Sequence, residues 1–199
     1  MNKRSIRHID FDGKTVLVRV DFNVPKRGED ISDDSRIRAA LPTLSLLSRG
    51  GAKVVICSHF GRPAGQVIEE MSLQPVRKRL SEILNKPILD AGGPRGEQTS
   101  KIVSQLGPGE FALLENLRFE SGEEENDEHF SKYLASLADL YVNDAFGAAH
   151  RAHASTTGVA KYIPAYAGLL MEREIAMLGR SLEGSTGATV AIIGGAKVS

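Results

Sequence analysis

The fold is decided by one stretch near the N-terminus, Thr15-Val16-Leu17-Val18-Arg19-Val20-Asp21-Phe22-Asn23. β-Branched and aromatic residues dominate it, which favours a β-strand. Successive side chains of a strand point to opposite faces. One face of this strand therefore carries Val16, Val18, Val20 and Phe22, and the other carries Leu17, Arg19, Asp21 and Asn23. Both faces begin apolar and the polar residues gather near the end, so we predict a strand that is covered on both sides.

Similar apolar runs recur along the chain and alternate with segments of helical spacing. The runs are 53–59, 87–90, 111–116, 140–143 and 188–194, and helices are predicted over 35–48, 72–84, 127–137 and 165–182. This alternation predicts an α/β fold, an open parallel sheet with helices on both faces in a Rossmann-like three-layer arrangement. The acid-rich segment 120–128 is expected to be a solvated loop that enters a helix.

The composition narrows the classes of function. With 199 residues, the chain suits one large domain, or one domain plus part of another. Its formal net charge of zero argues against bulk electrostatic attraction to nucleic acid or to an anionic membrane. Cys57 lies inside an apolar run and is predicted to be a buried residue in a reducing compartment. The first residues contain no signal peptide or membrane span, so we expect a cytoplasmic protein.

Polar clusters follow most of the predicted strands. They are residues 21–25, 58–63, 115–119, 143–147 and 150–153. In open parallel sheets, ligands bind outside the carboxyl ends of the strands, where such clusters meet. The cationic set is Arg36, Arg62, Arg118 and Arg151, with His59 and His153 as candidate additions. Guanidinium groups match phosphate and carboxylate, so we predict an anion site.

The ligand can be described by its chemistry only. Asp21 and Asn23 suit hydrogen bonds to a hydroxyl group, so a small molecule with a phosphate, a hydroxyl and a carboxylate would satisfy the set. His150 and His153 have a spacing that could hold zinc, but no cysteine or acidic residue joins them at a standard spacing, and no metal site is predicted. The residues by themselves do not name the reaction.

Several segments, in the same order along the chain, resemble the phosphoglycerate kinase family. They are Arg19–Pro25, His59–Pro63, Leu114–Phe119, Asp144–Gly147, His150–Ser155 and Gly194–Val198. The resemblance runs from about residue 6 to the end. Phe60 stands where the family usually has leucine, and Ala148 where it often has threonine.

The resemblance implies a glycolytic kinase that moves a phosphoryl group between 1,3-bisphosphoglycerate and ADP, giving 3-phosphoglycerate and ATP with Mg²⁺. It implies that Arg36, beside the reacting carboxylate, and Lys197, beside the transferring phosphoryl group, are catalytic. Its substrate-binding positions are Asp21, Phe22, Asn23, Arg36, His59, Phe60, Gly61, Arg62, Arg118 and Arg151. Its nucleotide-binding positions are Gly194, Gly195, Ala196 and Lys197.

The resemblance also implies a division of the chain into a 3-phosphoglycerate-binding domain (1–164), an interdomain helix (165–183) and the truncated start of a nucleotide-binding domain (184–199). A missing second domain would bind most of the nucleotide and Mg²⁺, so the chain alone is expected to be an inactive monomer that binds phosphoglycerate weakly. Its expected partners are these small molecules, with no nucleic acid and no membrane. Two alternatives are a non-catalytic phosphoglycerate-binding module and a metal-dependent hydrolase that uses Asp21, His59 and His153.

Overall fold

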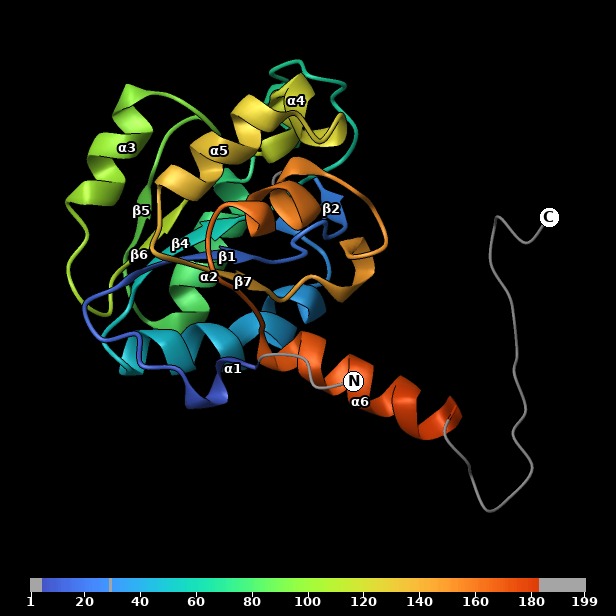
Figure 1. The fold of residues 1–199 in the computed structure, drawn as a ribbon. Helices are drawn as coiled ribbons and strands as arrows, with labels where there is room; N and C mark the ends of the chain where they lie inside the picture. Colours follow the sequence, from blue (N-terminus) through green and yellow to red (C-terminus); the bar gives the residue numbers. More distant parts are fainter. Residues whose placement is uncertain (1–4, 29, 183–199) are drawn as a thin grey trace.

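A parallel sheet forms the centre of the molecule (Figure 1). The computed structural model describes residues 5–28 and 30–182. Within them, the sheet has six strands in the order β5-β6-β4-β1-β7-β8, and every neighbouring pair is parallel. The strands are β1 (Thr15–Arg19), β4 (Lys53–Cys57), β5 (Ile88–Asp90), β6 (Phe111–Leu113), β7 (Leu140–Asn143) and β8 (Ala165–Ala167). A separate hairpin consists of β2 (Lys26–Arg27) and β3 (Asp30–Ile31).

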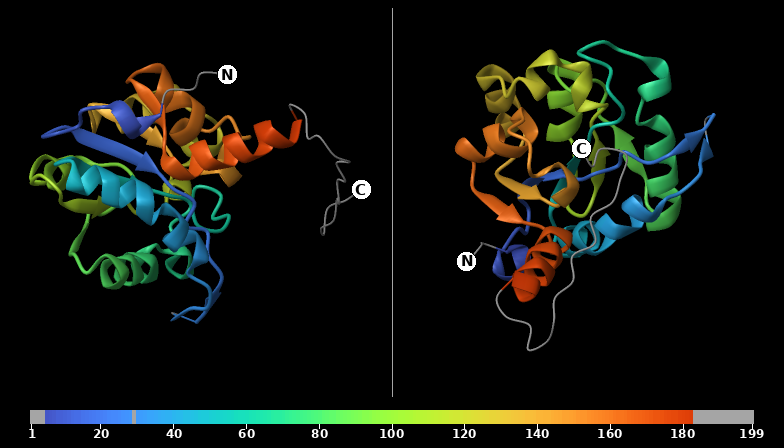
Figure 2. Two further views of the ribbon diagram at one scale, coloured as in Figure 1. Left: turned by 90° about the horizontal axis from the view of Figure 1, so that it is seen from below. Right: turned by 90° about the vertical axis from the view of Figure 1, so that its right-hand side faces the viewer.

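Helices cover both faces of the sheet, which confirms the predicted α/β architecture (Figures 1 and 2). They are α1 (Ser35–Arg49), α2 (Gln74–Leu84), α3 (Glu97–Ser104), α4 (Ser121–Glu124), α5 (Glu128–Ser136) and α6 (Leu169–Leu182). One core contains Val16, Val18, Val20 and Phe22 with apolar residues of α1 and α2. The other contains Leu17 with residues of α3 and α5. The alternation predicted for the first strand is therefore correct.

Strands β1, β4 and β6 end earlier than their apolar runs, which extend to residues 22, 59 and 116. β1 ends at Arg19, whose Cα lies opposite Cys57 of β4 on one side and Asn143 of β7 on the other. Beyond this level the chains leave the ladder, and the backbone groups bond to one another in loops. The polar clusters that follow the strands are therefore loops at the carboxyl edge of the sheet.

The prediction of one helix over 165–182 is wrong at its beginning. Ala165–Ala167 is the edge strand β8, which pairs with Tyr141–Asn143 of β7. Helix α6 begins only after Gly168, where a Cβ atom would lie 2.2 Å from Oδ1 of Asp144. That carboxylate oxygen accepts hydrogen bonds from the amides of Leu170 and Met171 in the first turn of α6, which are free donors at a helix start. The strand predicted over 188–194 lies outside the described residues.

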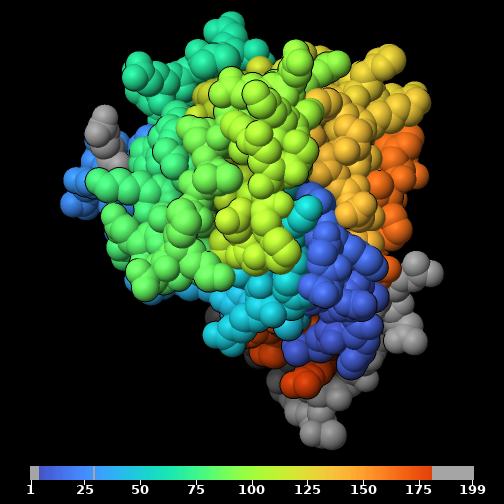
Figure 3. Space-filling model, turned by 90° about the vertical axis from the view of Figure 1, so that its left-hand side faces the viewer, coloured from blue at the N-terminus to red at the C-terminus, as the bar shows by residue number. Residues whose placement is uncertain are grey.

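Turns close the opposite edge of the sheet. The amide of Gly13 donates to the carbonyl of Gly51, and the amide of Gly109 donates to the carbonyl of Ala52. The blue, cyan and lime segments that contain these turns meet on the face shown in Figure 3. No helix in the described part of the chain is long and apolar enough to cross a membrane.

Candidate functional site

Loops from four adjacent strands meet at the carboxyl edge of the sheet. They follow β6, β4, β1 and β7, which are neighbours in that order. Direct hydrogen bonds tie them together. The amide of Gly61 donates to Oδ1 of Asn23 at 3.0 Å, and the amide of Phe22 donates to Oγ of Ser58 at 2.9 Å. These bonds fix segment 21–23 against segment 58–61.

Asn116 holds the loop after β4 against the loop after β6. It is fully buried, and its Oδ1 accepts hydrogen bonds from the amides of Phe60 and Arg118. Its Nδ2 donates to the carbonyls of Phe60 and Met71. All the hydrogen-bonding capacity of this amide is therefore used: three bonds hold Phe60 beside Arg118, and the fourth holds Met71.

Arg118 is a buried cation whose Nε atom has no hydrogen-bond partner in the described residues. Its side chain is 4% exposed; Nη1 donates to the carbonyl of Gly61 at 2.7 Å, and Nη2 lies 3.1 Å from Oε1 of Glu124. Nε is buried and has no partner within the described residues. Burial lowers the pKa of Arg118, and Arg151 and Arg19 lower it further against the effect of Glu124. An arginine remains charged under such shifts, so this spot favours an anion.

His59 lies within the same cationic cluster, beside the fully buried Arg19. Nη2 of Arg19 is 3.0 Å from Nδ1 of His59. A guanidinium group can only donate, so Nδ1 must accept and the ring proton must be on Nε2. Burial, followed by the charges of Arg19, Arg118, Arg151 and His153, lowers the pKa of His59 to about 2. His59 is therefore a neutral imidazole, and its Nε2–H has no protein partner in the described residues.

Arg36 reaches the site from the first turn of α1. Its Nη1 donates to Oδ2 of Asp21 at 2.7 Å, and half of its side chain is exposed. Gly147, in the loop after β7, lies so close that a Cβ atom there would be 3.0 Å from the same oxygen. The Asp21 carboxylate therefore lies between the start of α1 and the β7 loop.

The remaining predicted residues differ in their placement. The side chain of Phe22 is fully buried in the core, so only its backbone is available to a ligand. Phe60 is partly buried, with the Lys26 ammonium 5.3 Å from its ring centre. Arg62 is exposed, and Arg151 is partly buried. Gly194, Gly195, Ala196 and Lys197 lie outside the described residues.

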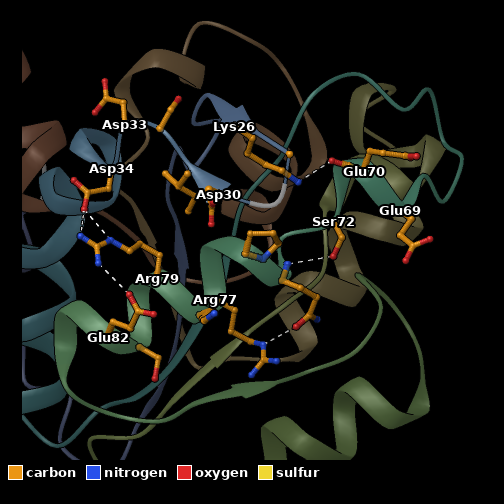
Figure 4. Close-up of a pocket in the computed structure, with 17 residues that line it drawn as sticks. Lys26, Asp30, Asp33, Asp34, Glu69, Glu70, Ser72, Arg77, Arg79 and Glu82 are labelled. Atoms are coloured by element: carbon orange, nitrogen blue, oxygen red, sulfur yellow. Dashed lines mark hydrogen bonds and ion pairs between the residues drawn. The ribbon is translucent and has the colours of Figure 1, made fainter.

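A large groove lies elsewhere, between the β2–β3 hairpin and α2 (Figure 4). Its volume is about 1600 Å³, and none of the predicted site residues lines it. Arg79 pairs there with Asp34 and Glu82, and the Lys26 ammonium donates to the carbonyl of Glu70. Because Arg79 is already paired with carboxylates and no predicted site residue lines this groove, we place the candidate site at the sheet edge.

Comparisons with known proteins show the family. The family model described as phosphoglycerate kinase matches residues 6–199. The chain belongs to the phosphoglycerate kinase family. It is similar to the phosphoglycerate kinase from Pyrococcus horikoshii OT3, with 36% identity, a TM-score of 0.90 and coverage of 98% of this chain and 49% of that one. It is also similar to phosphoglycerate kinase from Coxiella burnetii, with 40% identity, a TM-score of 0.82 and coverage of 92% and 46%. The chain thus spans about half the length of these kinases.

Three residues beside the site were missing from the predicted set: Arg19, Glu123 and Ser155. Arg19 is 1% exposed. The sequence did contain one signal for it, because an arginine inside a strand that is covered on both faces must have buried hydrogen-bond partners. Glu123 contradicts the expected solvated loop over 120–128, because it lies in α4 with 0% exposure. No local pattern marks it, since its partners Ser155 and His153 lie about 30 residues later in the chain, at the short helical turn Ala154–Gly158.

His153 faces this carboxylate, with Nδ1 3.6 Å from Oε1 of Glu123. The described residues contain no group of three or more histidine, cysteine, aspartate or glutamate side chains that could hold a metal ion. Cys57 is a buried free thiol, as predicted, and burial raises its pKa to about 12.

We predict that His59 makes the fold sensitive to mild acid. Its pKa falls from 6.5 when unfolded to about 2 when folded, so below pH 6.5 the unfolded state binds the extra proton. The free energy of unfolding should therefore fall by up to about 1.4 kcal/mol per pH unit as the pH decreases. Urea unfolding between pH 6.5 and pH 5 measures this slope. His59→Gln should reduce the slope by the contribution of about one bound proton, because glutamine does not titrate. The exposed His129→Gln is the control, and equal slopes for His59→Gln and wild type would contradict the prediction.

Proposed function

We propose that this chain is the phosphoglycerate-binding half of a phosphoglycerate kinase, which transfers a phosphoryl group from 1,3-bisphosphoglycerate to ADP and releases 3-phosphoglycerate and ATP. The observation that carries the proposal is the cationic cluster at the sheet edge. There, within the described residues, Arg118 keeps an unpartnered buried Nε, and His59, whose pKa the charge of Arg151 helps to lower, keeps a free Nε2–H. The proposed setting is glycolysis in the cytoplasm, with the protein a monomer.

The proposed roles follow from the chemistry of each group. Arg62, Arg118, Arg151 and His59 would hold the phosphate of 3-phosphoglycerate by charge and hydrogen bonds. Asp21 and Asn23 would bond to its hydroxyl group. Arg36 would lie beside the carboxylate that exchanges the phosphoryl group, and Lys197 would stabilise that group in transit. Such catalysis consists of positioning and charge neutralisation, and it requires no covalent nucleophile.

Magnesium would enter with the nucleotide, near Gly194–Lys197 and the half of the enzyme that this chain does not span. The described edge presents arginines, which repel a cation, so these residues do not fit an Mg²⁺ site of their own. When bound, Mg²⁺ neutralises charge on the transferring phosphates. The part of the reaction assigned to this chain is binding and orienting the phosphoglycerate.

Titration calorimetry of this chain tests the proposal. We expect saturable but weak binding of 3-phosphoglycerate and negligible heat with Mg²⁺-ATP, because most of the nucleotide site is elsewhere. Arg118→Gln should weaken 3-phosphoglycerate binding about tenfold or more, since it removes a charge-assisted donor. Lys132→Gln is the matched control, because Lys132 pairs with Glu128 on α5. Tight nucleotide binding, or no 3-phosphoglycerate binding, would count against the proposal.

A further inference from the structure

Glu123 is a carboxylate buried beneath the cationic cluster. It is 0% exposed, although the next two residues of this acid-rich segment, Glu124 and Glu125, are exposed. Its Oε1 accepts the hydroxyl proton of Ser155 at 2.6 Å, and its Oε2 accepts the amide of Ser155 at 2.9 Å. A buried charge is retained only where such partners compensate it.

The bonds continue in one direction from Glu123 to His59. The only proton of the Ser155 hydroxyl goes to Glu123, so its oxygen is left to accept from Nε of Arg19 at 2.8 Å. Arg19 in turn donates from Nη1 to the carbonyl of Val20 and from Nη2 to Nδ1 of His59. Each nitrogen atom of the Arg19 guanidinium therefore has one acceptor. Because Nδ1 of His59 is one of these acceptors, it carries no proton, and the ring proton is on Nε2.

We propose that Glu123 is a positioning residue which, through Ser155 and Arg19, fixes the ring proton of His59 on Nε2 and so keeps that N–H available to the anion bound at the sheet edge. The inference rests on the proposed function for the identity of the anion, 3-phosphoglycerate. It assigns Glu123 no contact with the ligand.

The charge state of Glu123 fits this role. Burial raises the pKa of Glu123, but the nearby His153 ring, the charge of Arg19 and the hydrogen bonds from Ser155 outweigh burial and hold the pKa below its ordinary value. The carboxylate is therefore ionised at neutral pH and accepts the Ser155 proton. A protonated Glu123 carboxyl group could also donate to the Ser155 hydroxyl oxygen, so the donor and the acceptor of this hydrogen bond would no longer be fixed.

A simpler role for Glu123 is to offset the positive charges, and it predicts the opposite effect on binding. If the carboxylate acted by charge alone, Glu123→Gln would make the edge more positive and tighten anion binding. If it acts through the hydrogen-bonded chain, Glu123→Gln would loosen the donor geometry and weaken binding. Ser155→Ala separates the two roles further, because it breaks the chain while the Glu123 charge remains.

The test is the ¹⁵N–¹H spectrum of the His59 ring in this chain without ligand, followed by calorimetry with 3-phosphoglycerate. Wild type should show a proton on Nε2 only. Glu123→Gln and Ser155→Ala should both show mixed tautomers and about tenfold weaker binding. Glu125→Gln, which removes an exposed charge two residues away, should match wild type in both measurements.

Two results would overturn the inference: a wild-type His59 protonated on Nδ1, or folded variants whose His59 spectrum is unchanged, whatever their affinity for 3-phosphoglycerate. The wild-type spectrum tests the tautomer even if Glu123→Gln does not fold, and circular dichroism checks folding. If wild type fails to bind 3-phosphoglycerate but the tautomers follow the pattern above, the proposed function fails and the role of Glu123 in fixing the tautomer is supported.

Discussion

Arg19→Met is expected to lower the free energy of unfolding by about 3–5 kcal/mol, the usual cost of removing one partner from a buried charged group. Arg19 is 1% exposed and its charge lies near Glu123, which is 0% exposed. Methionine fills a similar volume but donates no hydrogen bonds. The Ser155 hydroxyl and Nδ1 of His59 would each lose a bond, and the Glu123 carboxylate would remain buried without the Arg19 cation.

Urea unfolding at pH 7 measures this loss of stability. A double-mutant cycle then shows how much of the loss comes from the interaction between Arg19 and Glu123. Glu123→Gln alone leaves Arg19 as the uncompensated charge, so both single variants should be unstable. The double variant Arg19→Met/Glu123→Gln should recover part of the loss, because neither charge then remains. Arg38→Met is the matched control, since Arg38 is 53% exposed and pairs with Asp34 on the surface. A loss below about 1 kcal/mol, or strictly additive single costs, would refute the coupling between Arg19 and Glu123.

The sheet was predictable because its pattern is local. Alternation along 15–22 assigns the apolar side chains to one of two cores, and their burial follows that assignment. The edge strand β8 was not predictable, because 165–167 continues the apolar sequence of α6 and becomes a strand only through its pairing with β7. Helix α3 was also missed; it spans Glu97–Ser104, two turns with few apolar residues.

The site was predictable to the extent that its residues follow strands. His59 and Arg118 could be placed at one edge from their positions after apolar runs. Arg19 could not, because its side chain leaves the strand and reaches the site from within the core. The burial of Glu123 depends on Ser155, 32 residues further along the chain, and such a pairing leaves no trace in the local sequence.

Arg36→Ala is expected to lower turnover by about 10²- to 10³-fold, or roughly 3–4 kcal/mol of transition-state stabilisation, while 3-phosphoglycerate affinity changes only a few-fold. Arg36 is half exposed and its ion pair with Asp21 is at the surface, so it contributes little to the fold or to the unliganded site. In the proposed reaction, charge shifts on the carboxylate beside Arg36 as the phosphoryl group leaves, and a guanidinium there is most effective in the transition state.

The measurement is steady-state turnover in the complete kinase proposed to contain this chain, together with calorimetry of 3-phosphoglycerate on the chain itself. Arg38→Ala is the control, because Arg38 lies on the same helix with 53% exposure and pairs with Asp34. Arg36→Lys keeps the charge but loses the planar fork, so its turnover should fall between those of wild type and Arg36→Ala. Near-normal turnover with a raised Michaelis constant would place Arg36 in ground-state binding. In that case the anchoring of Arg36 by Asp21 would serve substrate affinity, and the transition-state charge would have to be met by groups such as Lys197.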